Sequence, residues 1–423
     1  DKRYQGAVNG AFLPSYSLGA DMANKDLKWE TTITRNIGVD FGFFNSRLTG
    51  TIDAYWNTTK DLLMKTAIPG ITGFTSTYAN VGQTSNKGIE IALQGVLVKT
   101  RDWNVTAGFN INFNRGKVDK LADNVTGLYG TEWATSSTFP KSDYVLKEGR
   151  PVGLVRGLTA DGFYTTDDFT YENGVYTLKE GVADVSSAVF PNYHLHNGMN
   201  ERPAGQLAYP GMAKFKDLND DGIINDDDVD VIGDMTPVHT GGFNINATYK
   251  NFDLGLYFNW SYGNEIYNVN KLAALYGYKE GAVYENKLSI VKDCYKIYDV
   301  VNGELVALTT PEQLNAANAN AKLPLAYSEN GYVSTLGIED GSYLRLNTLT
   351  LGYTLPKSML QKAGISNLRV YGSIYNVFTI TGYSGIDAEV STSTSTKTYP
   401  QLGMDWGTYP RARSFVLGVN LSF

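Results

Sequence analysis

The stretch from Trp103 to Asn114 alternates strictly between apolar and polar residues over its whole length. On an extended chain, one face carries Trp103, Val105, Ala107, Phe109, Ile111 and Phe113, and the other carries Asn104, Thr106, Gly108, Asn110, Asn112 and Asn114. Successive side chains of a β-strand point to opposite faces, so the pattern predicts a strand with one wholly apolar face. Such a strand is longer than the usual ~5–6 residues and long enough for the ~9–11 residues of a bilayer-spanning strand.

The same alternation recurs along the chain, in stretches that begin near Ile37, Ile89, Phe243, Phe252 and Phe415. Their polar faces carry Asn, Gly, Thr and single acids, and charged residues make up only 19% of the chain. A soluble outer face usually has more Lys and Glu, so the apolar faces are expected to meet lipid and the polar faces to line a wet lumen. The predicted fold class is therefore all-β, a transmembrane antiparallel β-barrel. A soluble β-protein is the alternative, and it would not need detergent.

The connections between these stretches differ strongly in length. "FFNSRL", "VKTRDW" and "YKNFDL" predict tight links, whereas 64–86, 115–151, 167–212 and 262–342 are expected to be long loops. Membrane barrels place short turns on the periplasmic side and long loops outside. The resulting strand directions require an odd number of strands. We expect nine, or eleven if 152–164 and 212–218 add two more.

The stretch "DLNDDGIINDDD" matches the spacing of a twelve-residue calcium loop. The candidate ligands are Asp217, Asn219, Asp221, the carbonyl of Ile223, Asn225 and Asp228. Gly222 permits the sharp bend, and Ile224 is expected to be an apolar anchor. Position 12 is Asp instead of Glu, so its arm is shorter. No flanking helices are predicted, so we expect structural Ca²⁺ that fixes a connection in the 217–228 loop; a solvated turn without metal is the alternative.

The two ends of the chain and its charge give further expectations. The last strand ends on Phe423, which resembles the insertion signal of bacterial outer-membrane barrels, although an ordinary edge strand can also end in Phe. The start, "DKRYQGAVNG", suggests a cut within a longer protein. A net charge of -7 without a basic cluster argues against nucleic acid as a partner. The single cysteine, Cys294, excludes an intrachain disulfide.

Several blocks together resemble one family, the SusC/RagA-type TonB-dependent transporters of Bacteroidetes outer membranes. The blocks are 26–63, 87–95, 215–233, 338–356 and 409–423. The resemblance implies that 1–423 is the C-terminal portion, about half, of a 22-stranded plugged barrel, with the plug domain and first strands outside this chain.

The resemblance also implies a function and a set of partners. Such barrels actively import large nutrients, oligosaccharides or peptides, across the bacterial outer membrane. The implied partners are a SusD-like surface lipoprotein that caps the barrel, TonB acting through the plug, the N-terminal portion of the same barrel and outer-membrane lipid. A dimer of transporter–lipoprotein pairs is a further expectation.

Other functional classes have weaker support in the sequence. A passive outer-membrane porin would share every strand pattern but lack the plug. An enzyme is not expected, because His194, His196 and His239 stand in no catalytic motif. A set of loop aromatic residues offers candidates for stacking on sugars: Tyr129, Trp133, Tyr193, Tyr276, Tyr278 and Trp406.

Overall fold

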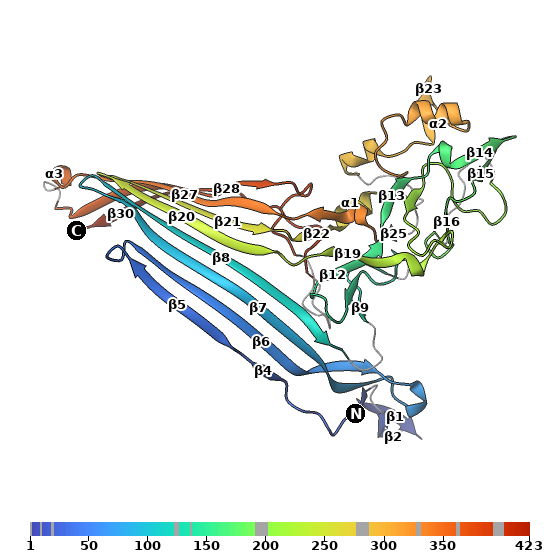
Figure 1. Ribbon diagram of the computed structural model, residues 1–423, viewed down its shortest axis with the longest axis horizontal. Coiled ribbons are helices and arrows are strands. Elements are labelled where there is room, and N and C mark those ends of the chain that lie inside the picture. Colours follow the sequence, from blue (N-terminus) through green and yellow to red (C-terminus); the bar gives the residue numbers. More distant parts are fainter. Residues whose placement is uncertain are drawn as a thin grey trace.

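Long antiparallel strands form one curved sheet, which we call the wall, in the computed structural model of residues 1–423 (Figure 1). The described residues are 2–8, 11–17, 21–121, 127–135, 138–190, 202–275, 287–326, 331–360, 364–391 and 402–423. The wall consists of β4 (Thr31–Ile33), β5 (Asn36–Phe43), β6 (Leu48–Ala67), β7 (Ser76–Lys99), β8 (Trp103–Lys120), β20 (His239–Tyr249), β21 (Phe252–Tyr262), β27 (Tyr343–Thr354), β28 (Asn367–Thr381) and β30 (Ser414–Ser422).

The order of strands in the wall follows the chain. It runs β30-β28-β27-β21-β20-β8-β7-β6, and β4 and β5 both pair with β6 as two segments of one interrupted strand. β3 (Asp21–Met22) adds only a two-residue parallel pairing with β7. The described residues therefore contain nine long wall strands, as predicted. The alternative of eleven is wrong, because the strands within 152–164 and 212–218 belong to other sheets.

Strand register confirms which face of the wall is apolar. One row across neighbouring strands joins Ile52, Ile91, Ile111, Gly241, Trp260 and Leu344. The adjacent row on the opposite face joins Asp53, Glu90, Asn112, Thr240 and Ser261. Because cross-strand partners point to the same side, the first row is apolar throughout and the second is polar.

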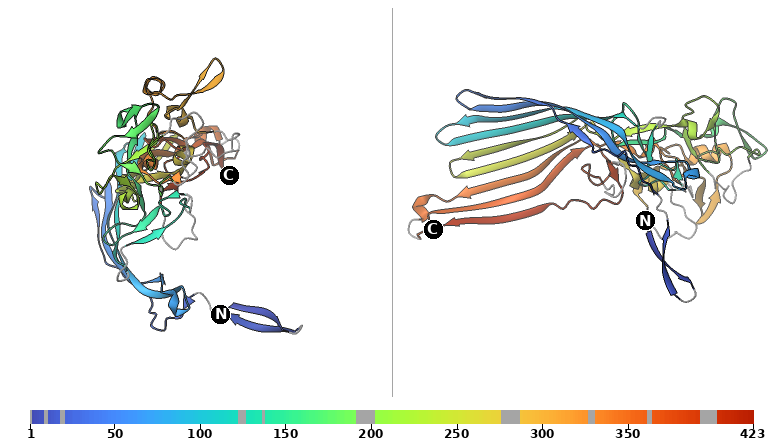
Figure 2. Two further views of the ribbon diagram at one scale, coloured as in Figure 1. Left: turned by 90° about the vertical axis from the view of Figure 1, so that its right-hand side faces the viewer. Right: turned by 90° about the horizontal axis from the view of Figure 1, so that it is seen from below.

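The wall is an open sheet whose two edges are β5 and β30 (Figure 2). Among the described residues, β5 pairs only with β6, and β30 pairs only with β28. Both edges thus present a row of backbone N–H and C=O groups without strand partners in the part of the chain that the structure describes.

Some inward-facing glycines of the wall lie beside large inward side chains. A Cβ at Gly88 would lie 2.3 Å from the Tyr55 hydroxyl, and one at Gly418 would lie 2.3 Å from the Tyr371 ring. The space above each glycine is therefore filled by a tyrosine from the neighbouring strand.

The tight links were predicted correctly, but two of the long loops are shorter than expected. β20 and β21 are joined by Lys250, which has a left-handed φ of 50°, and Asn251. The predicted loop 64–86 is wrong in its extent, because β6 and β7 remain paired as far as Ala67 and Ser76. Only a turn with a 3-10 helix, η1 (Gly70–Thr72), separates them. β8 likewise continues to Lys120.

The described residues of the long connections 121–238, 263–342 and 382–413 gather at the end of the wall opposite the tight turns, and we call them the cap (Figure 1). Its strands are β9 (Leu128–Gly130), β10 (Thr138–Phe139), β11 (Tyr144–Leu146), β12 (Leu154–Leu158), β13 (Ala160–Phe163), β14 (Phe169–Glu172), β15 (Val175–Leu178), β16 (Asp184–Val185), β17 (Ala213–Phe215), β18 (Ile223–Ile224), β19 (Val229–Asp234), β22 (Glu265–Asn268), β23 (Tyr298–Val301), β24 (Glu304–Ala307), β25 (Gly331–Tyr332), β26 (Ile338–Asp340) and β29 (Met404–Asp405). Its helical segments are η2 (Thr166–Asp168), η3 (Asp226–Asp228), α1 (Val269–Leu275), η4 (Ser289–Asp293), α2 (Pro311–Ala317) and η5 (Thr335–Gly337).

The cap has a conventional hydrophobic core, which the sequence did not predict. Leu158, Tyr164, Tyr176 and Leu272 are fully buried within one cluster. Outside the cap, β1 (Lys2–Val8) and β2 (Ala11–Ser17) form a separate hairpin, and α3 (Lys357–Leu360) lies between β27 and β28. None of the helices in the described ranges has the length and apolar character needed to cross a bilayer.

Candidate functional site

A cavity of about 1000 Å³ lies where the wall meets the cap. Its lining includes the wall residues Asn57, Asn86 and Asn112 and the cap residues Val152 and Thr236. Among the described residues, the side-chain oxygens of Asn86 and Asn112 are buried without a hydrogen-bond partner. Amide groups of this kind can bind hydroxyl or amide groups of a polar ligand without adding charge.

The inner face of the wall also carries a buried ion-pair cluster around Arg345. This arginine is 2% exposed and donates hydrogen bonds to Asp387, to Glu389 at 3.1 Å and to Thr379 at 2.9 Å. Arg411 approaches the same two acids, at 3.6 and 2.9 Å. Buried charges need such partners, so the cluster fixes the segment 383–390 against β27.

That segment, the strap, is also tied to other parts of the cap. The Tyr383 hydroxyl donates to the buried carboxylate of Asp405 at 2.7 Å. Ser384 and Lys271 both donate to Glu339, with bonds of 2.8–3.1 Å. Burial would raise the pKa of Glu339, but these hydrogen bonds outweigh it and the pKa is lowered. The strap thus connects the wall to the rest of the cap through side chains.

A second stabilised acid of the cap is Asp168 at the end of η2. Its carboxylate accepts from Lys214 at 2.7 Å and from the backbone of Thr165 at 2.7 Å. Burial would raise the pKa of Asp168, but these bonds prevail and hold it below the ordinary 3.8. The fold therefore favours the ionised form of this acid.

The acidic loop 217–228 lies between β17 and β19, without flanking α-helices, as predicted. Asp217 accepts from the backbone N–H groups of Asp221 and Gly222, at 3.3 and 2.7 Å. Asn219 donates to the Asp221 carboxylate at 2.9 Å. Gly222 has a φ of 85°, the left-handed conformation that the sharp bend requires. The first half of the loop is thus curled around its own polar side chains.

The second half of the acidic loop is anchored in the cap. Ile224 is fully buried, which confirms its predicted role, and β18 pairs in parallel with β16. Asp228 is also fully buried, and its carboxylate accepts from Leu218 at 2.7 Å and Asn225 at 2.8 Å. The Asn225 amide nitrogen donates to the Ile223 carbonyl at 3.1 Å.

All six predicted calcium ligands therefore lie in one folded loop, with several of their oxygens engaged by the backbone. Within the described ranges, no group of three or more His, Cys, Asp or Glu side chains forms a cluster that could hold a metal ion. Calcium binding at Asp217, Asn219, Asp221, Ile223, Asn225 and Asp228 stays a prediction.

The remaining candidates lie in different surroundings. Tyr129 is half exposed with the Arg156 guanidinium 4.8 Å from its ring centroid, whereas Trp133 packs against the cap core. Trp406 is 49% exposed. His239 is a wall residue that accepts a hydrogen bond from the Trp260 indole at 3.0 Å. Five of the candidates lie outside the described residues: Tyr193, His194, His196, Tyr276 and Tyr278.

The Arg345 cluster was missed from the sequence. Arg345 interrupts the apolar and neutral residues of "YLRLNTLTLGY", and the acids follow as "DAE" more than 40 residues later. A lone charge within a strand was the available signal, but nothing in the sequence identified its partners.

Comparisons with known proteins agree with the geometry of the wall. Residues 4–377 match the family described as TonB dependent receptor-like, beta-barrel. TonB-dependent receptor P3 of Formosa agariphila is 30% identical over 98% of this chain and 36% of its own length. TonB-dependent receptor SusC of Bacteroides thetaiotaomicron is 29% identical over 95% of this chain and 32% of its own length. The chain thus spans about a third of these relatives.

Two solved structures have a similar fold. The RagAB peptide importer in its closed-closed state gives a TM-score of 0.69 at 24% identity, covering 100% of this chain and 38% of that one. The RagAB peptide transporter gives 0.67 with the same coverage and identity.

Proposed function

Because the chain belongs to the TonB dependent receptor-like, beta-barrel family and is of the SusC/RagA type, we propose that it forms part of the barrel of an energy-driven outer-membrane importer. The wall carries this proposal, since its apolar rows face outward and its polar rows face a lumen. Its two unpaired edges support completion by further strands of the same barrel. Unpaired backbone groups in lipid cost several kcal/mol each, so an open wall is unfavourable in a membrane.

The proposed substrates are large nutrients, either oligosaccharides or peptides. The junction cavity offers neutral amides and hydroxyls, which can bind hydroxyl groups of sugars or the peptide backbone alike. The similarity to a RagAB peptide importer favours including peptides in any screen. A SusD-like lipoprotein over the cap and TonB acting through a plug complete the proposed machine.

The test is uptake by cells that carry the full-length protein. Material that copurifies with the native complex is identified by mass spectrometry and then supplied in labelled form. Active import predicts accumulation that requires TonB and stops when the proton-motive force is collapsed. Equal entry with and without energy would instead identify a passive porin. Copurification of an abundant lipoprotein would support the proposed lid.

We also propose that the acidic loop binds one structural Ca²⁺. Its support is the curled backbone around Gly222, with Asp217, Asn219 and Asp221 side chains on one short segment. The carboxylate, amide and carbonyl oxygens are the ligand types that Ca²⁺ prefers. Bound cation would reduce the repulsion among the acids and hold 217–228 against the cap core.

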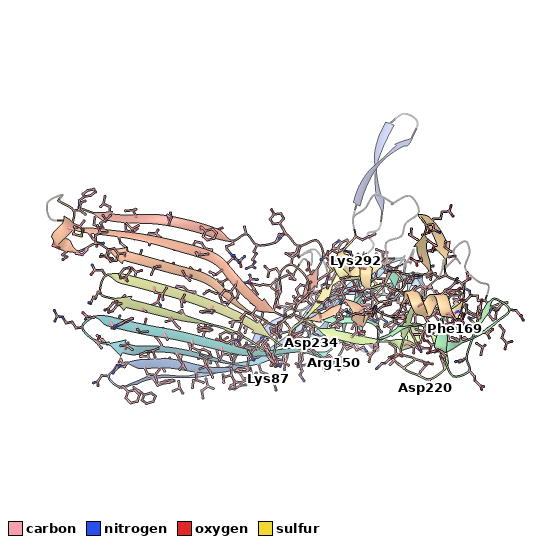
Figure 3. The ribbon with its side chains drawn as sticks, turned by 90° about the horizontal axis from the view of Figure 1, so that it is seen from above. Lys87, Arg150, Phe169, Asp220, Asp234 and Lys292 are labelled. Carbon is pink, nitrogen blue, oxygen red and sulfur yellow. The ribbon has the colours of Figure 1, made fainter. Side chains whose placement is uncertain are left out.

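Calcium titration of the full-length protein tests this second proposal. We expect the chelated protein to be cut faster by proteases within 217–228, and added Ca²⁺ to restore resistance. Asp217→Asn should weaken that restoration about tenfold or more. Asp220→Asn is the control, because Asp220 lies in the same loop (labelled in Figure 3) but occupies no ligand position. Equal behaviour of the two variants would refute calcium binding.

A further inference from the structure

Aromatic residues form a band at each end of the outward face of the wall. Near the cap, His239 stacks on Tyr262 at 5.0 Å and meets Phe113 at 5.4 Å. Near the tight turns, the rings of Trp103 and Tyr249 lie 4.4 Å apart. Aromatic bands of this kind mark the two membrane–water interfaces of a barrel.

The spacing of the bands matches a bilayer. Trp103 and Phe113 lie on the same strand, β8, and ten steps along a strand cover about 34 Å. A strand tilt of ~40° reduces this to about 26 Å across the membrane, close to the ~25 Å apolar band of such barrels. Phe113 therefore lies at the upper limit of the hydrocarbon.

The next outward row beyond Phe113 carries two cations side by side. Trp56, Lys87 and Arg115 are direct cross-strand partners on β6, β7 and β8. Arg115 is two residues beyond Phe113 on an uninterrupted strand, so its row faces the same side. The row therefore lies at the level of lipid headgroups. Like charges placed directly opposite each other are destabilising.

Neither cation is neutralised by an acid within the described residues. Lys87 forms no ion pair there, and Figure 3 shows it where the wall meets the cap. Arg115 donates from Nη1 to three neutral backbone carbonyls, those of Asn114, Pro237 and Val238, at 3.0, 2.8 and 3.1 Å. These bonds fix the guanidinium in place but leave Nε and Nη2 as donors.

A neighbouring cation shows the contrast. Lys117, one row further out, pairs with Asp119 at 3.2 Å. The Asp119 carboxylate also accepts hydrogen bonds from Ser85 at 2.8 Å and from Gln83 at 3.2 Å. Asp119 is therefore committed to Lys117, and within the described residues Lys87 and Arg115 form no ion pair with it or with another acid of the cavity, Asp234.

We propose that Lys87 and Arg115 together bind the phosphate of an outer-leaflet lipid, with Trp56 packing beside its upper acyl chain. The fork of Arg115 suits two phosphate oxygens, and Lys87 adds a second positive charge. Trp56 is 46% exposed on the same row, as expected of an interfacial ring. The site rests on the proposed membrane location, and its three residues also line the junction cavity.

Native mass spectrometry of the full-length protein tests the site. The protein is released from bilayers that contain phosphatidylglycerol, or phosphatidylcholine alone, and the retained lipids are counted. We expect one phosphatidylglycerol to be retained preferentially and to be lost at high salt. K87Q and R115Q should each weaken retention about fivefold, as expected for one cation at a membrane surface. K117Q is the matched control and should leave retention unchanged.

Folding of each variant is checked by resistance of the barrel to unfolding in cold SDS. R115K and K87R keep the charge and should retain the lipid, which separates loss of the site from loss of the fold. Equal retention by K87Q, R115Q and K117Q would overturn the proposal. Displacement of the lipid by millimolar inorganic phosphate, with phosphate itself retained, would show an anion site that does not require lipid and would also overturn it.

Discussion

The wall and the cap use the same apolar residue types in opposite ways. In the wall, Leu417 is 89% exposed and Phe415 is 71% exposed, while Asp53 and Asn112 face inward. In the cap, Leu272 is fully buried, as in a water-soluble protein. The apolar side chains of one chain therefore contact lipid in the wall and other protein side chains in the cap. Wall leucines are stabilised by lipid and cap leucines by close packing, which gives the two regions different responses to substitution.

The largest expected difference is for leucine truncation. Leu272→Ala should destabilise the cap by about 2–5 kcal/mol, because it leaves a cavity in a packed core beside Gly337. Leu417→Ala on the wall leaves no cavity, since lipid fills the space, and should cost only the lost transfer free energy, about 2 kcal/mol, without the cavity term that adds to the cost at Leu272. Denaturant titration of each variant in lipid bilayers measures the two changes in the free energy of unfolding. Similar costs would remove the distinction between the regions.

A charge tests the facing of the wall itself. Phe109 lies about midway between the aromatic bands, so Phe109→Arg should cost about 2–4 kcal/mol and impair membrane insertion. Asn110→Arg places the same side chain on the opposite face, toward the polar lumen, and should be tolerated. The fraction of folded protein in outer-membrane preparations reports both effects. Equal loss for the two variants contradicts the assignment of faces.

The smallest expected effect is a pH response confined to the cap. The pKa of Asp168 is lowered in the fold, so its stabilisation is complete above the unfolded value near 3.8 and is lost as pH falls through the folded pKa. Asp168→Asn should destabilise the cap by about 1 kcal/mol at neutral pH and by nothing at the lowest pH. Protease resistance of the cap between pH 3 and 7 measures this. A constant difference across that range would argue against the ion pair with Lys214.

How far the sequence alone predicted the structure differs between the two regions. In β8, the alternation from Trp103 to Asn114 predicted both the strand and which of its side chains face outward. Side chains alternate between the two faces of a strand, and the lipid-facing ones must be apolar, so both features can be seen in the residue types. The tight links of the wall were also predicted correctly, because they are the short stretches between consecutive alternating segments. In the acidic loop, the bend at Gly222 and the burial of Ile224 were predicted correctly, because both depend on local spacing.

The cap could not be predicted in the same way. "VGLVRGL" was considered as a wall strand, yet Leu154, Val155 and Leu158 are all buried inside the cap. Its strands are short, and some of them, such as β12, are buried on both faces and so leave no alternation in the sequence. The Arg345 cluster and the junction cavity depend on contacts between residues far apart in the chain, such as Arg345 with Asp387.

The paired glycines and tyrosines of the wall have a consequence for the choice of strand register during membrane insertion. Alternation alone allows two strands to slip by two residues, since apolar side chains would still face lipid. Such a slip would move Tyr55 away from Gly88, or Tyr371 away from Gly418, and bring each ring against a residue that has a side chain. Each tyrosine therefore fits only the strand register in which it lies opposite its glycine. The wall can vary freely in its lipid-facing residues while the correct alignment of its strands is preserved from within.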